Sequence, residues 1–274
     1  RWLGRKHAER GVYLLLVILQ AAHRWLIRAK FLPSSARFSL SLDRPDGSET
    51  YCFRREEVEA MIQHCRKSKG LSWLERVIIV LACTGLRISE LVGLRWSDVD
   101  LQAGVIVLTD ERASHRRKGL GNARRVKGKR TRRIPICPQL HDVLTKLPVH
   151  SDGRLLHDQA DRPLVGRRIR NALIRDVVVP IAPQFPTPPG EVGFEHGRLH
   201  SFRHYFVSEC FRQGAMESEI MSWTGHRDPK LVALYRHLRQ EDGIARMSRI
   251  QFLPESANDN HFDGMINRDE QRST

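Results

Sequence analysis

Residues 71–96 read LSWLERVIIVLACTGLRISELVGLRW. The first part, residues 71–85, is mostly apolar and ends at Gly85, which predicts a buried helix that stops at the glycine. A second, shorter helix is expected within residues 87–96, so Arg87 lies at the turn between the two helices. Arg87 can pair with Glu90 on the helix surface, or it can belong to a binding site at this turn.

The segments on either side predict a mainly helical domain with one small sheet. Helices are expected at residues 54–70, 138–176, 198–214 and 216–226. Two β-branched segments, GVIVLT (104–109) and RRIPIC (132–137), predict strands. Residues 177–193 hold five of the 13 prolines and predict an irregular loop. The expected fold class is α+β, mainly helical, with a small antiparallel sheet.

The chain divides by composition into four parts. Residues 7–32 keep apolar residues at helical spacing without proline, whereas residues 33–50 are rich in Pro, Ser, Gly and Asp. The N-terminal part is too small for a whole domain and begins at Arg1, so we expect a fragment of a longer protein. The predicted boundaries are a partial helical domain at 1–33, a linker at 34–50, the main domain at 51–252 and a polar flexible tail at 253–274.

The charge is strongly basic and is concentrated in one segment. The formal net charge is +15 and the pI is about 10.3, which favours a polyanionic partner such as nucleic acid. Residues 110–133 hold eleven Lys or Arg against two acidic residues, a density more typical of nucleic-acid contacts than of a solvated loop. The candidate DNA-binding residues there are Arg116, Arg117, Lys118, Arg124, Arg125, Lys129 and Arg130.

The apolar runs and the cysteines bear on whether the protein enters a membrane and on the compartment in which it works. The longest apolar run, Val12 to Leu19, is too short to span a bilayer, so no membrane partner is expected. The five cysteines are scattered without a CxxC pair, which predicts reduced thiols in a cytoplasmic protein. No zinc cluster or disulfide framework is expected.

Four separated segments carry residues suited to phosphate chemistry. They are TGLRISELVGLRW with Arg87, VKGKRTRRIPI with Lys127, HSFRH with His200 and Arg203, and TGHRDPKLVALY. The last segment places Tyr235 nine residues after His226. Each has an ordinary structural reading: His200 and Arg203 can share a solvent-facing helix side, His226 can close a turn, and Tyr235 can pack in a core.

Taken together, these segments resemble the tyrosine recombinase (phage integrase) family. The resemblance covers a catalytic domain from about residue 51 to about residue 250, and residues 7–32 resemble the last part of the family's core-binding domain. It implies a site-specific DNA recombinase, an integrase of a mobile element, that cuts and rejoins DNA through a 3′-phosphotyrosine intermediate. The implied catalytic residues are Arg87, Lys127, His200, Arg203, His226 and Tyr235.

The resemblance also implies a role for each residue. Tyr235 would attack the phosphodiester, and Arg87 and Arg203 would hold its non-bridging oxygens. Lys127 would protonate the leaving 5′-oxygen; Lys129 can serve instead, because the basic insertion shifts the register. His200 would assist proton transfer, and His226 would hydrogen-bond the phosphate.

Elementary chemistry favours the same residue types. Guanidinium groups match phosphate oxygens in two-point fashion, and a phenol with a pKa near 10 needs a base or nearby cations to attack at neutral pH. The leaving alkoxide needs a proton donor. The arginines and lysine supply the positive charge, so neither a metal, a cofactor nor ATP is expected.

The expected partners are double-stranded DNA, a homotetramer on two DNA sites and accessory DNA-bending proteins. Residues 243–252 are the candidate segment for docking on a neighbouring subunit. The sequence departs from the usual family pattern at Ser201 within the HxxR motif and at TGH in place of LGH.

Three other functions remain open at this point. A truncated integrase can be a DNA-binding remnant without catalysis. His196, His200 and His204 recur every four residues and can line one helix face as ligands of a metal-dependent nuclease. A type IB topoisomerase would use the same tyrosine chemistry to relax supercoils.

Overall fold

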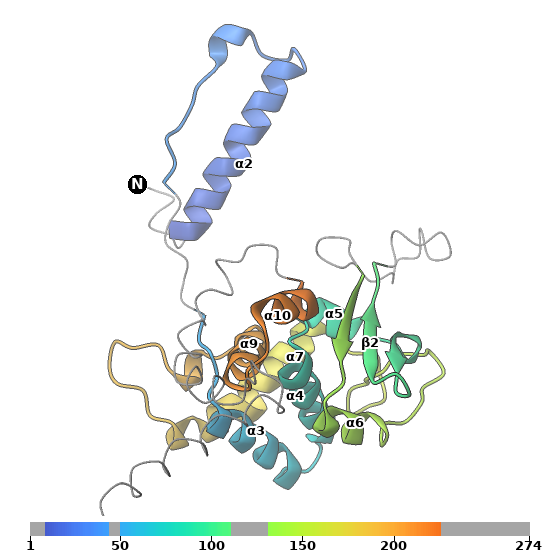
Figure 1. Ribbon diagram of the computed structural model, residues 1–274. Coiled ribbons are helices and arrows are strands. Elements are labelled where there is room, and N and C mark those ends of the chain that lie inside the picture. Colours follow the sequence, from blue (N-terminus) through green and yellow to red (C-terminus); the bar gives the residue numbers. More distant parts are fainter. Residues whose placement is uncertain (1–8, 44–49, 111–130, 226–274) are drawn as a thin grey trace, which may run out of the picture. The chain divides into compact units, whose positions relative to one another are not determined.

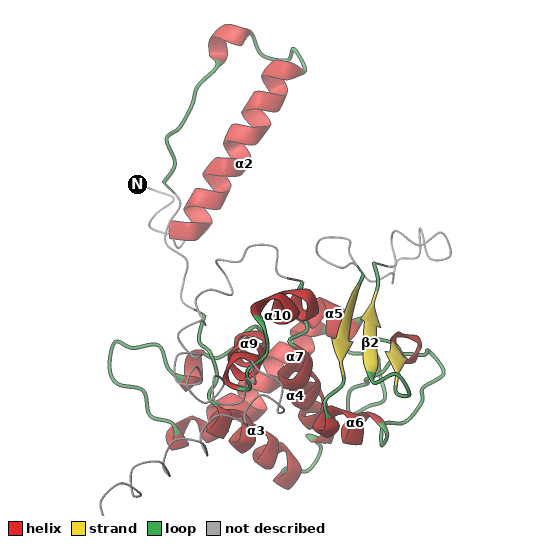
Figure 2. Cartoon of the chain, viewed as in Figure 1, coloured by secondary structure: helices red, strands yellow, loops and turns green. Residues whose placement is uncertain are grey.

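The structure is a computed structural model, and it describes residues 9–43, 50–110 and 131–225 (Figure 1). The chain divides into two compact units, Arg1–Glu49 and Thr50–Thr274. Figure 2 shows that the second unit is built mainly of helices with one small sheet.

The N-terminal unit is one helix with a segment folded along it. Helix α2 spans Glu9–Arg28 and is followed by a short 3-10 turn, η1 (Ser34–Ala36). Gln20 donates hydrogen bonds of 3.4 Å to Ser39 Oγ and to the Leu40 carbonyl, and the His23 and Phe38 rings lie 4.1 Å apart. Within residues 7–32, the predicted helical character is confirmed for Glu9–Arg28, which form a single long helix.

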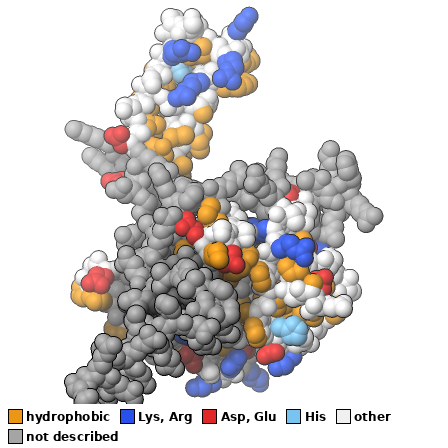
Figure 3. All heavy atoms as spheres, in the orientation of Figure 1, with side chains coloured by type: hydrophobic (Ala, Val, Ile, Leu, Met, Phe, Trp, Pro, Cys, Tyr) orange, Lys and Arg blue, Asp and Glu red, His pale blue; other side chains and the backbone are white. Residues whose placement is uncertain are grey.

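Much of the apolar surface of this unit is exposed. Leu14, Ile18, Leu19 and Trp25 are all more than half exposed, and Figure 3 shows hydrophobic side chains on its surface beside Lys and Arg. Residues Gly11–Arg28 are long and apolar enough to cross a membrane, a length that the eight-residue run at Val12 did not reveal. One such helix near an N-terminus is weak evidence for a membrane span, because signal sequences and core helices meet the same criterion.

The core of the second unit is a buried helix surrounded by others. Helix α4 (Ser72–Thr84) packs against α3 (Arg55–Lys67) and α9 (Ser201–Arg212). It is followed at once by α5 (Ile88–Val92) and the 3-10 turn η2 (Trp96–Asp98). The two helices predicted within residues 71–96 are confirmed.

A three-stranded antiparallel sheet packs beside these helices in the order β1-β2-β3. The strands are β1 (Val99–Asp100), β2 (Val105–Leu108) and β3 (Arg132–Pro135). Ile106 pairs with Ile134, and Leu108 pairs with Arg132 at the end of the ladder. The two longer strands were predicted, whereas β1 has only two residues and leaves no periodic signal.

The prediction of helix at residues 138–176 is wrong for the middle of this segment. Helix α6 (Pro138–Leu144) ends early, and α7 starts only at Gly166 (Gly166–Ala172). Residues 145–165 form an irregular loop with two isolated bridges, Arg95 to Arg154 and His157 to Pro163. Two prolines and an Asp-Gly pair in this loop are the physical reason, since each disfavours helix.

The prediction of an irregular loop at residues 177–193 is wrong for the first residues of this segment, which are helical. Helix α7 continues through a π-helical stretch, η3 (Leu173–Val178), into α8 (Val179–Ile181) and a 3-10 turn, η4 (Ala182–Gln184). Pro180 has no N–H, so the carbonyl of Asp176 lacks its usual helical donor. His64 Nε2 lies 2.8 Å from that carbonyl oxygen and takes the donor's place.

The last described elements lead toward the predicted site. A 3-10 turn, η5 (Phe194–His196), precedes α9, and α10 (Glu217–Thr224) packs against α9 and β3. Helix α10 ends at Gly225, whose φ of +68° is left-handed. The helices predicted at 198–214 and 216–226 are confirmed within a few residues.

Candidate active site

The turn between α4 and α5 positions the first arginine. Gly85 closes α4 with a φ of +59°, and a Cβ at this position would lie 2.6 Å from Cδ1 of Phe206. Glycine is therefore required both by the backbone conformation and by the close approach of α9. The reversal at Gly85 places Arg87 at the start of α5.

Arg87 is held by a carboxylate of its own helix. Its backbone N–H donates a 2.8 Å hydrogen bond to Glu90 Oε2, and its Nη1 donates a 3.3 Å bond to Oε1. The Arg87 side chain is 21% exposed, whereas that of Glu90 is 1% exposed. The pairing considered from the sequence is therefore real, but it is wrong to place it on the helix surface.

Glu90 also binds a second arginine, Arg132, which comes from β3. The Arg132 Nη1 and Nη2 groups donate hydrogen bonds of 3.0 and 2.6 Å to the two Glu90 oxygens, a two-point pairing in a buried position. Burial tends to raise the pKa of Glu90, but the bonds and charge of Arg132, with those of Arg87, bring that pKa below its usual value. Glu90 is thus a carboxylate that links α5 to the sheet.

Arg132 lies in a predicted strand and is not among the predicted site residues. A signal for it was present, since Arg132 and Ile134 are two residues apart in a strand and so face the same side. Both are buried, while the alternate residue Arg133 is exposed. An arginine on the apolar face of a strand requires a buried anionic partner, and the acidic residue of the short helix after Gly85 is the one that provides it.

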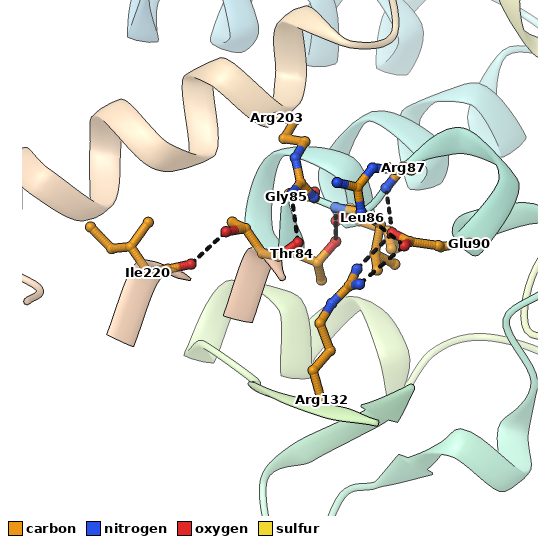
Figure 4. Close-up of polar contacts among 10 residues, drawn as sticks. Thr84, Gly85, Leu86, Arg87, Glu90, Arg132, Arg203 and Ile220 are labelled. Atoms are coloured by element: carbon orange, nitrogen blue, oxygen red, sulfur yellow. Dashed lines mark hydrogen bonds and ion pairs between the residues drawn. The ribbon is translucent and has the colours of Figure 1, made fainter. Parts of the chain in front are cut away.

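Arg203 reaches the same place from α9 and is 2% exposed. Its Nη1 donates a 2.7 Å bond to the carbonyl of Gly85, 118 residues away in sequence, and its Nη2 donates a 2.5 Å bond to the carbonyl of Thr224. Figure 4 shows the guanidinium groups of Arg203 and Arg87 at the turn after α4, with Arg132 approaching Glu90 from the sheet. The two carbonyl bonds connect the C-terminal ends of α4 and α10.

The electrostatics of this cluster favour an anion. Burial and then the positive charge of Arg87 lower the pKa of Arg203 to about 9, with Glu90 opposing and Arg132 adding to the shift. Arg203 nevertheless stays protonated at neutral pH. Three guanidinium groups around one carboxylate leave an excess of positive charge, and such groups bind phosphate oxygens in two-point fashion.

His200 and His204 lie at the start of α9. His200 is exposed at the N-cap position, and its ring meets that of His204 edge-on with centroids 5.0 Å apart. Burial, followed by the charges of His200 and Arg203, lowers the pKa of His204 to about 4. The interpretation that His200 and Arg203 share a solvent-facing helix side is correct for His200, which is exposed. It is wrong for Arg203, which is buried.

The metal-ligand reading of His196, His200 and His204 is not supported by this geometry. His196 belongs to the turn η5, and Gly197 separates it from α9, so the three do not share one helix face. Within the described ranges, the only set of three residues placed to bind one ion is His150, His157 and Asp161.

The sequence of the chain matches a known protein family. The sequence model of the Phage integrase family matches residues 52–242. The chain belongs to the phage integrase family.

Two tyrosine recombinases illustrate how similar the chain is to known proteins. The tyrosine recombinase XerD of Lacticaseibacillus casei is 25% identical over 240 residues, which cover 87% of this chain and 75% of that protein. XerC of Staphylococcus saprophyticus is 29% identical over 199 residues, covering 69% and 57% respectively.

Solved integrase structures share the fold. A lambda integrase dimer bound to a COC′ core site has a TM-score of 0.62 at 14% identity, covering 87% of this chain and 77% of that one. The Tn1549 transposon integrase in complex with a circular intermediate DNA has a TM-score of 0.59 at 20% identity, covering 85% and 76%. The predicted α+β fold, mainly helical with a small antiparallel sheet, is confirmed.

Several predicted integrase residues lie outside the described part of the chain. They are Lys127, His226, Tyr235, the seven candidate DNA-binding residues of the basic segment and the docking segment 243–252. The residue just before His226 is described: a Cβ on Gly225 would lie 3.2 Å from Arg132 Nη1. The last described residue, Gly225, therefore lies beside the Arg132–Glu90 pair.

Proposed function

We propose that this chain is a site-specific DNA recombinase that cuts and rejoins double-stranded DNA through a 3′-phosphotyrosine on Tyr235. The observation that carries the proposal is the cluster of Arg87 and Arg203 around the Gly85 turn, in a chain of the phage integrase family. Two guanidinium groups anchored by protein oxygens are preorganised to bind a phosphodiester, because their orientation does not depend on the ligand.

The proposed first step is nucleophilic attack by the Tyr235 hydroxyl oxygen on phosphorus. The bond from phosphorus to the 5′-oxygen breaks, and that oxygen takes a proton from Lys127, or from Lys129, to leave as a hydroxyl. His200 assists proton transfer from the tyrosine, and His226 donates a hydrogen bond to the phosphate. Rejoining reverses these steps with a new 5′-hydroxyl, so no ATP is consumed.

The arginines have distinct surroundings in this proposal. Arg203 is oriented by the carbonyls of Gly85 and Thr224, and Arg87 is oriented by Glu90, which Arg132 holds in place. Arg87 and Arg203 would contact the non-bridging oxygens, where negative charge increases in the transition state. Glu90 and Arg132 are positioning residues that need not touch DNA.

The proposed assembly is a homotetramer on two DNA sites, with accessory DNA-bending proteins as possible further partners. The basic segment would contact DNA through Arg116, Arg117, Lys118, Arg124, Arg125, Lys129 and Arg130. The related lambda and Tn1549 integrase structures contain DNA, which supports DNA as the partner here. We propose the cytoplasm as the site of action, a core-binding fragment at 1–33, a linker at 34–50, the catalytic domain at 51–252 and docking through 243–252.

Covalent trapping tests the proposal. The full chain is incubated with a DNA substrate nicked near the scissile phosphate, so that the released fragment diffuses away and the protein remains attached. Wild type is expected to form a protein–DNA adduct in the presence of EDTA, whereas Tyr235→Phe forms none. Tyr205→Phe is the matched control, because Tyr205 lies on α9 outside the arginine cluster, and it should retain the adduct.

Each alternative function has its own outcome in this experiment. DNA binding by wild type without cleavage or adduct would identify a binding remnant. DNA cleavage that leaves no adduct and is lost in EDTA would identify a metal-dependent nuclease. Relaxation of a supercoiled plasmid that lacks the specific site would favour a topoisomerase. Adduct formation by Tyr235→Phe at the wild-type level would remove the proposed nucleophile.

A further inference from the structure

We propose that His150, His157 and Asp161 form a binding site for a transition-metal ion of the Zn²⁺ class. The three residues lie in the irregular loop 145–165 between α6 and α7, outside the arginine cluster. This site goes beyond the proposed recombinase chemistry, which requires no metal.

The side chains already converge. One potential ligand atom from each residue lies within 4.8 Å of the others. The His150 and His157 rings have centroids 3.7 Å apart with an angle of 37° between their planes, and His150 Nδ1 lies 2.9 Å from Asp161 Oδ1. A tetrahedral ion with bonds of about 2 Å needs its ligand atoms roughly 3–3.5 Å apart, so the two imidazole rings, now face to face, must reorient for both to bind the ion.

His157 provides the second, independent observation. Its side chain is only 6% exposed, and its Nε2 lies 3.1 Å from Asp152 Oδ2. Among the residues that the structure describes, nothing hydrogen-bonds to the buried Nδ1 of His157. In neutral His157, Asp152 accepts the proton of Nε2, so Nδ1 carries a lone pair.

A lone pair without a donor in a buried position is unfavourable, and a bound cation would satisfy it. A carboxylate that holds one imidazole nitrogen while the other faces a metal is the usual outer support of histidine ligands. Asp152 is therefore a positioning residue for the proposed ligand His157.

The backbone presents the third ligand at a conformational cost. Asp161 has a φ of +56°, a left-handed conformation that is unfavourable for most side chains and is tolerated best by Gly, Asn and Asp. The turn is fixed by Asp158, whose Oδ1 accepts hydrogen bonds from the N–H groups of Ala160 and Arg162. It holds the Asp161 carboxylate toward His150.

The ligand types select the class of ion. Two imidazole nitrogens and one carboxylate oxygen are typical of Zn²⁺ and its neighbours Co²⁺, Ni²⁺ and Cu²⁺, whereas Mg²⁺ and Ca²⁺ prefer oxygen ligands throughout. Three protein ligands leave the fourth position to water.

The loop braces the segment that follows α5. Trp96 N–H donates a 3.0 Å bond to the Gly153 carbonyl, and Leu155 N–H donates a 3.0 Å bond to the Leu94 carbonyl. Arg154 Nη1 adds a 2.6 Å bond to the Val92 carbonyl at the end of α5. A metal bound by the loop would therefore stabilise the support of the helix whose first turn carries Arg87.

Metal titration of the full chain tests the site. Metal-free protein is titrated with Zn²⁺ by calorimetry and with Co²⁺ by visible absorption, and its thermal unfolding is followed in parallel. We expect one tight Zn²⁺ per chain, a raised Tm, and Co²⁺ bands of tetrahedral type without the near-ultraviolet band of thiolate ligands. The absence of that near-ultraviolet band would show that none of the five cysteines binds the ion.

Two conservative variants locate the ion. Asp161→Asn keeps a residue that tolerates the left-handed backbone, and Asp152→Asn keeps the shape of the supporting side chain. Each is expected to weaken Zn²⁺ binding about 10- to 100-fold, with unchanged circular dichroism in the metal-free state. His141→Asn is the control, because His141 is an exposed histidine on α6 and its loss should leave the affinity unchanged.

Three results would overturn the proposal. They are an absence of Zn²⁺ binding by wild type, equal Zn²⁺ affinity of wild type and Asp161→Asn, and a thiolate band in the Co²⁺ spectrum. Loss of adduct formation by Tyr235→Phe concerns the recombinase proposal alone and leaves the metal site unaffected.

Discussion

Two ion pairs in this protein have similar geometry and opposite surroundings. Arg132 and Glu90 approach to 2.6 Å with side chains 6% and 1% exposed. Arg162 and Asp158, in the loop before α7, approach to 3.0 Å with side chains 59% and 11% exposed. The contact distances alone would rank them as nearly equal.

The difference lies in what remains when one partner is removed. A buried charge that loses its partner is left without water or a counterion, whereas an exposed arginine is rehydrated at once. Distance therefore says which groups are paired, and burial says how strongly the fold depends on the pair. Substitutions at these two pairs, and at other buried positions, test this difference.

Glu90→Gln is expected to destabilise the protein by about 3–5 kcal/mol, because it leaves the charges of Arg132 and Arg87 facing a neutral amide. Urea unfolding at pH 7 measures the change. The double variant Glu90→Gln/Arg132→Met is the control: it removes the buried charge as well, so it should be less destabilised than the sum of the two single variants. A loss below about 1 kcal/mol for Glu90→Gln would mean that this pair behaves like a surface pair.

Gly85→Ala is expected to cost roughly 2–3 kcal/mol, since alanine is strained at a φ of +59° and its Cβ would overlap Phe206. Gly225→Ala is the matched variant, with a similar φ of +68° but with its nearest neighbour, Arg132 Nη1, at 3.2 Å, which is a tight contact rather than an overlap. It should cost only about 1 kcal/mol. If thermal or urea unfolding gave equal losses of stability for the two variants, backbone strain alone, and not packing, would set the cost at both glycines.

His204 is expected to make the fold sensitive to acid. Its pKa in the folded chain is about 4, mainly because of burial, against 6.5 in the unfolded chain, so the unfolded state binds the proton more tightly. Stability is fully present above pH 6.5 and declines as the pH falls toward 4. Since His204 is partly exposed, we expect a loss of about 1–2 kcal/mol over this window.

The measurement is urea unfolding at several pH values between 7.5 and about 4. His204→Asn should remove this part of the pH dependence, and the exposed His141→Asn should keep it. Parallel curves for His204→Asn and wild type would contradict the assignment.

Arg162→Ala is expected to change stability by about 0.5 kcal/mol or less, because the pair with Asp158 is open to solvent and screened by salt. Urea unfolding at low and high salt measures the change and its screening. A loss above about 2 kcal/mol would break the contrast with Arg132 and Glu90.

Most of the fold could be predicted from local patterns. Helix α4 is marked by its apolar residues and by Gly85, and β2 and β3 by their β-branched residues. The errors fall where local rules compete: the loop 145–165 has apolar residues at helical spacing interrupted by turn residues. The helix at Pro180 continues because His64, from a distant segment, satisfies the carbonyl that proline leaves without a donor.

The site could be predicted only in part. Arg87 and Arg203 stand in recognisable motifs, and the structure brings both to the turn after α4. The burial of Arg203 and the link from Glu90 to Arg132 could not be read from motifs, because they depend on how α9 and β3 pack against that turn. The roles of Lys127, His226 and Tyr235 remain predictions.

The pairing of Leu108 with Arg132 has a consequence for how such a chain can change over generations. This pair is the last rung of the ladder before the connection between β2 and β3, and Arg132 is anchored there by Glu90. The ends of the connection are thus fixed by the core rather than by the connection itself. Doubling the length of a flexible loop adds only about 0.6 kcal/mol of closure entropy, so a fold whose loop ends are fixed tolerates insertions and deletions between them. The DNA contacts proposed for that connection can therefore change while the arginine cluster stays constant.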